Sequence, residues 1–124
     1  MKLNAKEFDR AVDRAVRRIP AEIRSQLENV VITVRKRPTR DMLEDAGIPP
    51  GETLLGLYQG AALTERSFFA PVEYPDTIFI FQEPLEEMCG TLEELEREIE
   101  ITVVHEVAHF LGIEEERLAE LGYE

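Results

Sequence analysis

The sequence has few of the residues on which several kinds of metal and redox site depend. Among its 124 residues there are two histidines, no tryptophan and one cysteine, Cys89. A single cysteine excludes an intrachain disulfide and a zinc cluster built from thiolates. We expect Cys89 to be a small core residue rather than a reactive thiol. Histidine nitrogens and carboxylate oxygens therefore remain as the donors for a metal.

Long apolar segments are also missing. The N-terminus, residues 1–9, carries a charge every few positions and cannot form the apolar region of a secretory signal. The longest strongly apolar run, residues 30–34, is far shorter than the roughly 20 residues of a membrane-spanning helix. We therefore expect a cytoplasmic protein with no membrane partner. The length and the 44% hydrophobic content predict a single domain over residues 1–124.

Positive charge is scarce over most of the chain. The net charge is −12, yet residues 1–40 hold eleven basic and five acidic residues, a local charge of +6. Residues 41–124 hold three basic and 21 acidic residues, a local charge of −18. Such a molecule should repel nucleic acid, and the basic stretch at 35–40 is too short to reverse that effect. The charge pattern argues against a nucleic-acid partner.

Apolar periodicity predicts helices and strands in alternation. Phe8, Ala11, Val12 and Ala15 follow the spacing of an amphipathic helix over residues 5–18, and Pro20 ends it or begins a second short one. Runs of β-branched and aromatic residues predict strands, and Pro and Gly mark their ends. The further expected elements are a strand at 29–36, a short helix at 39–46, a strand at 53–60, a loop at 61–76 and a strand at 77–82.

A long helix is expected in the C-terminal third of the chain. Thr91 to Glu94 match a capping box, in which the Thr91 hydroxyl caps the first turn and Glu94 reaches back. The helix can run to about Leu111, where Gly112 supplies a stop signal. The last twelve residues predict one more short helix. Together these elements indicate an α+β fold, in which about three or more strands pack beside the long helix.

The long helix carries the pattern H-E-x-x-H at His105, Glu106 and His109. Four residues is about one helical turn, so both imidazoles can reach one zinc ion (Zn2+) while a further position stays open for water. Glu106 is suited to act as general base, taking a proton from the zinc-activated water. The sequence therefore predicts His105 and His109 as metal ligands and Glu106 as the catalytic residue.

The faces of this helix divide by residue type. At about 100° per residue one third of its circumference should carry the chemistry and the opposite side should be core. The first group is Glu98, Thr102, His105, Glu106 and His109, and the second is Val103, Val104, Val107, Ala108 and Leu111.

A third protein ligand is required, and no other histidine exists in the chain. A helix that continued past Gly112 would carry Glu115 out of reach of the metal, so the chain must turn there. The string from His105 to Glu115 has the metzincin spacing H-E-x-x-H-x-x-G-x-x-H, with Glu115 in place of the third histidine. We predict Glu115 as third metal ligand, with Glu114 and Glu116 as alternatives. All three could instead be the solvated start of a helix.

Over Leu54–Gly60, Leu63–Arg66, Pro75–Ile78 and Thr102–Ile113, the chain resembles the minimal-zincin family of short bacterial zinc metallopeptidases. No methionine follows Gly112, so the Met-turn of the metzincins proper is absent. The resemblance implies a zincin-like α+β unit in which a few strands pack beside the motif helix, with an acid at the Glu115 position as third ligand.

The leading functional hypothesis is hydrolysis of a peptide bond in a peptide or protein substrate. One of the three expected strands, with the strand at 77–82 as the first candidate, could pair with an extended substrate at the sheet edge. The strand at 77–82 could instead be only part of the core. The alternative is a non-catalytic zinc-binding or protein-interaction domain with a degenerate peptidase fold. An RNA-processing metalloenzyme is opposed by the charge pattern. Oxyanion support stays open among Tyr58, Arg66, Tyr74 and Tyr123.

Overall fold

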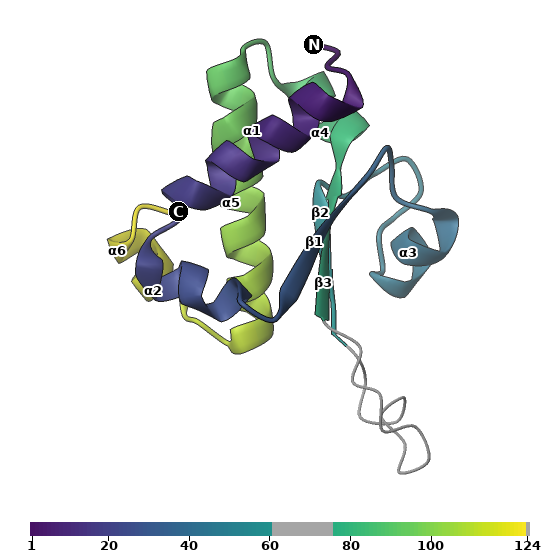
Figure 1. The fold of residues 1–124 in the computed structure, drawn as a ribbon. Helices are drawn as coiled ribbons and strands as arrows, with labels where there is room; N and C mark the ends of the chain where they lie inside the picture. The colour runs from purple at the N-terminus through teal and green to yellow at the C-terminus, as the bar shows by residue number, and fades with distance from the viewer. Residues whose placement is uncertain (61–75, 124) are drawn as a thin grey trace.

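The computed structural model describes residues 1–60 and 76–123 (Figure 1). The expected loop at 61–76 lies outside the described residues except for Asp76, which begins a strand. The elements in order are α1 (Ala5–Arg18), α2 (Ala21–Arg24), the 3-10 turn η1 (Ser25–Leu27), β1 (Val30–Arg35), α3 (Arg40–Asp45), β2 (Gly56–Gln59), β3 (Asp76–Phe81), α4 (Gln82–Met88), α5 (Leu92–Leu111) and α6 (Glu115–Glu120).

The sheet has three described strands in the order β1-β3-β2. β1 runs parallel to β3, with Ile32 opposite Ile78, and β2 runs antiparallel to β3, with Tyr58 opposite Ile78. The strand predicted at 77–82 is therefore the central one. The expectation that it offers a free edge to a substrate is wrong, because β1 and β2 occupy both of its sides. The sheet edges belong to β1 and β2.

The core lies where α5 meets the sheet on one side and α1 on the other (Figure 1). The helix predicted at 5–18 is confirmed, and its Phe8, Ala11 and Ala15 side chains are fully buried. Ile78 and Ile80 of β3 are also fully buried. Cys89 is 5% exposed, as expected of a small core residue. No helix within the described parts of the chain is long and apolar enough to cross a membrane.

The sequence does not predict the helix α4, because Pro84 indicates only the end of the strand expected at 77–82. Proline is tolerated in the first turn of a helix, where its missing N–H would have no intrahelical partner. Leu85 is fully buried, and the buried Glu86 accepts a hydrogen bond of 2.7 Å from the Leu3 N–H. Seven residues are too few to show a clear helical period in the sequence.

Glu96 is a buried acid at the contact between α1 and α5, with a relative exposure of 3%. Arg14 Nε donates to its Oε2 at 3.0 Å, and Arg18 Nη2 lies 2.8 Å from Oε1. Among the described residues Oε1 has no hydrogen-bond partner of suitable geometry, so the Arg18 contact is one of charge alone. The two arginines compensate the desolvation of the carboxylate and connect the helices.

Candidate metal centre

The helix α5 is fixed at both ends by the residues that the sequence indicated. The Thr91 hydroxyl accepts a hydrogen bond of 3.1 Å from the Glu94 N–H. The Glu94 carboxylate accepts from the Gly90 N–H at 3.2 Å rather than from the Thr91 N–H of a full capping box. Gly112 ends the helix with a φ of 71°, in the left-handed region that favours glycine. The predicted turn at Gly112 is confirmed, and α6 begins three residues later.

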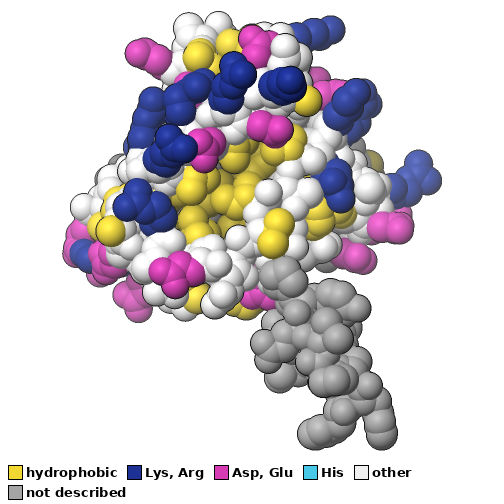
Figure 2. Space-filling model, in the orientation of Figure 1, with side chains coloured by type: hydrophobic (Ala, Val, Ile, Leu, Met, Phe, Trp, Pro, Cys, Tyr) yellow, Lys and Arg dark blue, Asp and Glu magenta, His cyan; other side chains and the backbone are white. Residues whose placement is uncertain are grey.

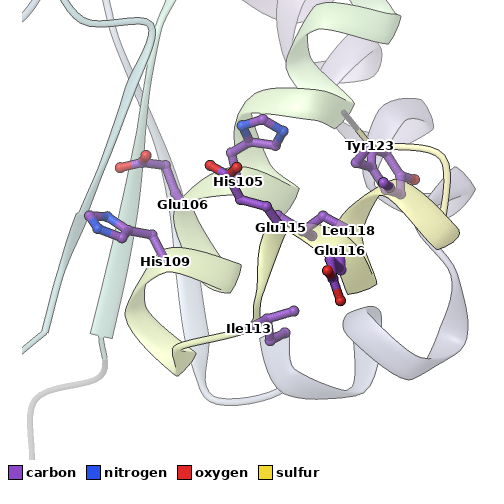
Figure 3. A pocket seen from close by; sticks show the side chains of 9 residues that line it. His105, Glu106, His109, Ile113, Glu115, Glu116, Leu118 and Tyr123 are labelled. Carbon is purple, nitrogen blue, oxygen red and sulfur yellow. The ribbon is translucent and has the colours of Figure 1, made fainter.

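A pocket of about 600 Å³ lies between the C-terminal half of α5 and α6 (Figure 3). The predicted metal ligands and the predicted base all line this pocket. The alternative ligand Glu116 and four less polar residues complete its wall. The lining residues are His105, Glu106, His109, Ile113, Glu115, Glu116, Leu118, Ala119 and Tyr123. Glu114 is the N-cap residue of α6 and is not among them. Glu115 and Glu116 thus line the same pocket as the two histidines, whereas Glu114 does not.

The side chains in this pocket do not all converge. Figure 3 shows His105 and His109 directed to different sides of the motif helix. The Glu115 side chain extends from α6 toward the motif turn, and the Glu116 carboxylate is directed away from it. Within residues 1–60 and 76–123, no three His, Cys, Asp or Glu side chains are grouped closely enough to hold a metal ion. Both imidazoles are exposed, so a change of their rotamers requires no repacking of the core.

Glu106 is half-buried and anchored to the neighbouring sheet edge. Its Oε1 accepts a hydrogen bond of 3.0 Å from the backbone N–H of Tyr58 in β2. Burial raises the pKa of the Glu106 carboxyl, and the Tyr58 N–H, His109 and His105 offset part of that rise. One carboxylate oxygen is thus held by the strand. Sequence reasoning missed this contact, because no local pattern shows which N–H on another element will face the motif helix.

The approach of β2 to α5 depends on a glycine. A Cβ atom at Gly56 would lie 2.5 Å from Thr102 Cγ2 and 3.0 Å from the Phe79 backbone oxygen. Thr102 is 8% exposed and packs close to this strand, although its spacing predicts the helix face opposite the core. Leu111, predicted in the core, is 43% exposed. Thr102 precedes Glu106 by one helical turn, so the contact at Gly56 also sets how close the Glu106 carboxylate comes to Tyr58.

Gly56→Ala is expected to destabilise the protein by about 1–3 kcal/mol, because the added methyl group must push β2 away from α5. Gly90→Ala is the matched control, since a Cβ atom there meets nothing within 4 Å. Adding Thr102→Ser to Gly56→Ala removes the clashing methyl group and should restore part of the loss. Urea denaturation of the unaltered protein and the three variants measures their free energies of unfolding. Equal stability of the two single glycine variants would contradict the close-packing argument.

Two aromatic residues considered for oxyanion support already have carboxylate partners. The Tyr58 hydroxyl donates to Asp76 Oδ2 at 2.7 Å, and its ring stacks on Phe110 with centroids 4.1 Å apart. The Tyr123 hydroxyl donates to the buried Glu100 at 2.5 Å. Burial, followed by this hydrogen bond, raises the pKa of Tyr123 to about 12. The other two candidates, Arg66 and Tyr74, lie outside the described residues.

Comparison with known proteins identifies the family. The family model described as zincin-like metallopeptidase matches residues 27–123, which include the whole sheet, α5 and α6. The chain belongs to the zincin-like metallopeptidase family. A solved structure of a conserved hypothetical protein from Thermus thermophilus is similar in fold, with a TM-score of 0.57 and 22% sequence identity over 93% of this chain and 96% of that one. No curated protein matches the chain.

The donor set of this zincin-like protein suits the metal that its family generally binds. Imidazole nitrogen and carboxylate oxygen are the ligands of catalytic zinc sites, and both types line the pocket between α5 and α6. The two imidazoles come from a single rigid helix, and the acids come from the next helix after the Gly112 turn. The residues present therefore fit zinc by donor chemistry, although the rotamers of those described do not form a ligand group.

Proposed function

We propose that the protein is a zinc-dependent peptidase that hydrolyses peptide bonds. The single observation that carries this proposal is the anchored Glu106. It lies in the same pocket as two histidines, and the Tyr58 N–H holds one of its carboxylate oxygens. A metal site that only braces a fold does not require a half-buried carboxylate beside its ligands.

His105, His109 and Glu115 are the residues that would hold the metal. Glu115 is favoured over Glu116 because its side chain extends toward the motif turn in Figure 3, whereas the Glu116 carboxylate is directed away. Glu114 is the least suitable of the three acids, because it precedes α6 and does not line the pocket. When bound, zinc supplies a Lewis acid that polarises the scissile carbonyl and lowers the pKa of water.

Glu106 would move the protons of the reaction. With Oε1 held by the Tyr58 N–H, its Oε2 can accept a proton from the attacking water. The same carboxyl group can then donate this proton to the leaving amine. Its raised pKa, caused mainly by burial, brings it closer to the value at which both transfers are efficient. An extended peptide would lie along β2, the sheet edge that contacts Glu106.

A second candidate is a zinc-binding domain without peptidase activity. It is favoured by one observation, namely that the two imidazoles point to different sides of the helix within the described structure. In that case zinc would draw α5 and α6 together and stabilise the fold without a productive site.

The proposal is tested by incubating the zinc-loaded protein with a mixture of unstructured peptides and identifying new termini by mass spectrometry. Cleavage is expected, with loss on chelation and recovery when zinc is restored. Magnesium added after chelation is the control, because it is poorly suited to a site of two imidazoles. Zinc binding without any new termini would support the second candidate instead.

A further inference from the structure

We propose that the β1 edge of the sheet binds an extended acidic segment of a partner protein by strand addition. This surface is distinct from the pocket, because Glu106 contacts β2, which lies at the opposite edge of the sheet. The inference therefore does not depend on the proposed peptidase activity.

The first observation is the composition of an edge strand. β1 spans six residues, Val30–Arg35, and β3 is its only strand partner among the described residues. Its sequence, VVITVR, contains four β-branched apolar residues and no charge before Arg35. Proteins commonly protect edge strands with inward-pointing charges, prolines or bulges. This strand has a proline only beyond its end, at Pro38, so most of its length is suited to pairing.

The second observation is an apolar hollow beside the strand. Val30, Ile32 and Val34 share the sheet face of the buried Ile78 and Ile80 but are only partly buried. The long helix α5 covers that face over β2 and β3. Figure 2 shows apolar side chains gathered in a hollow on the face formed by α1, α2 and β1. On the other face of the strand, Val31 is 45% exposed. Apolar side chains of an added strand could pack into this hollow.

Charge complementarity indicates the kind of occupant. In Figure 2 Lys and Arg side chains, with a few acidic ones between them, border the hollow. The segment that forms this face, residues 1–40, carries a net charge of +6. Two copies joined through their β1 edges would bring two such segments together, so repulsion disfavours a second copy as the occupant. A strand that alternates apolar with acidic residues could make three kinds of contact at once. Its apolar side chains would pack in the hollow, its backbone would hydrogen-bond to β1, and its acidic side chains would pair with the basic residues at the border.

The test uses the full chain and a synthetic nine-residue peptide, Glu-Val-Glu-Ile-Thr-Val-Glu-Val-Asp, blocked at both ends. Isotope-labelled protein should show NMR shift changes at β1 and α1 on titration. A peptide with lysine at each acidic position should bind at least about tenfold more weakly. N-methylation of alternate residues removes every second backbone N–H of the acidic peptide. Two such peptides are measured, one for each set of alternate residues, and the one that loses the N–H groups facing β1 should not bind.

Matched variants separate the apolar from the electrostatic contribution. Ile32→Lys should weaken binding more than about tenfold although it adds positive charge, because it places an ammonium group in the hollow. Lys36→Glu, at an exposed position just after β1, should weaken binding without altering the hollow. Leu92→Lys is the control, since Leu92 is 41% exposed on α5. It should leave the affinity unchanged.

Three results would overturn the proposal. One is shift changes confined to residues outside β1 and α1. Another is equal affinity for the acidic and lysine peptides. The third is a dimer of the free protein in sedimentation velocity that Ile32→Lys abolishes, because the edge would then be occupied by a second copy.

Discussion

Glu106→Gln is expected to lower peptide cleavage by about 10²–10⁴-fold and to leave zinc binding unchanged. Glutamine has nearly the same shape, and its amide oxygen can still accept the hydrogen bond that Tyr58 N–H donates to Oε1. It cannot accept a proton from water at neutral pH. The change therefore removes the proposed base but keeps the hydrogen bond from Tyr58. Cleavage rates on a fluorogenic peptide measure the loss of the base, and metal analysis measures whether zinc is still bound.

Glu116→Gln is the matched control for this experiment. Glu116 lines the same pocket, but its carboxylate is directed away from the motif turn. The same loss of charge there should change the cleavage rate far less. If both variants lowered the rate equally, the effect would come from the charge of the pocket and not from a base at Glu106. If Glu106→Gln also lost zinc, its carboxylate would be a ligand.

The sequence predicted the described elements best where several local signals agree. The helix at 5–18 combined an apolar period with a proline after it, and the long helix had Thr91 at one end and Gly112 at the other. The helix α4 had one signal, Pro84, whose meaning depends on position. Proline has a fixed φ and no backbone N–H, and both properties are tolerated at the end of a strand as well as in the first turn of a helix.

Sheet order and buried charges could not be predicted, because they depend on partners distant in sequence. β3 lies between β1 and β2, and it pairs there with strands from which other parts of the chain separate it. Glu96 looks like a surface residue until Arg14 and Arg18 of α1 are placed beside it. Arg14 and Glu96 are 82 positions apart, and a charge pair at that separation leaves no periodic signal in the chain.

The candidate site divides in the same way. The spacing of His105, Glu106 and His109 is local and was sufficient to predict one helical turn that carries all three. Their support is not local, because the Tyr58 N–H and the close approach at Gly56 come from another strand. Gly56 looked like an ordinary strand residue in the sequence. A glycine inside a strand can mark a close backbone approach, and that signal could have identified it.

His105→Ala is expected to lower zinc affinity by more than about 100-fold, since changes to outer-shell partners alone cost about 10–100-fold. His109→Ala and Glu115→Ala should have similar effects. Competition with a chromogenic chelator measures each affinity without reference to any substrate. The imidazole of His105 is exposed, so its removal should change the unfolding free energy of the metal-free protein by no more than about 0.5 kcal/mol.

Glu116→Ala and Glu114→Ala decide the identity of the third ligand. If Glu115 holds the metal, both variants should keep the affinity of the unaltered protein, because Glu116 is directed away from the motif turn and Glu114 lies outside the pocket. A loss in Glu116→Ala with none in Glu115→Ala would transfer the role to the neighbouring acid. If His105→Ala and His109→Ala left the zinc affinity unchanged, the proposed metal site would be wrong, and so would the peptidase proposal that depends on it. The strand-addition proposal at β1 would be unaffected, since its binding assay requires no metal.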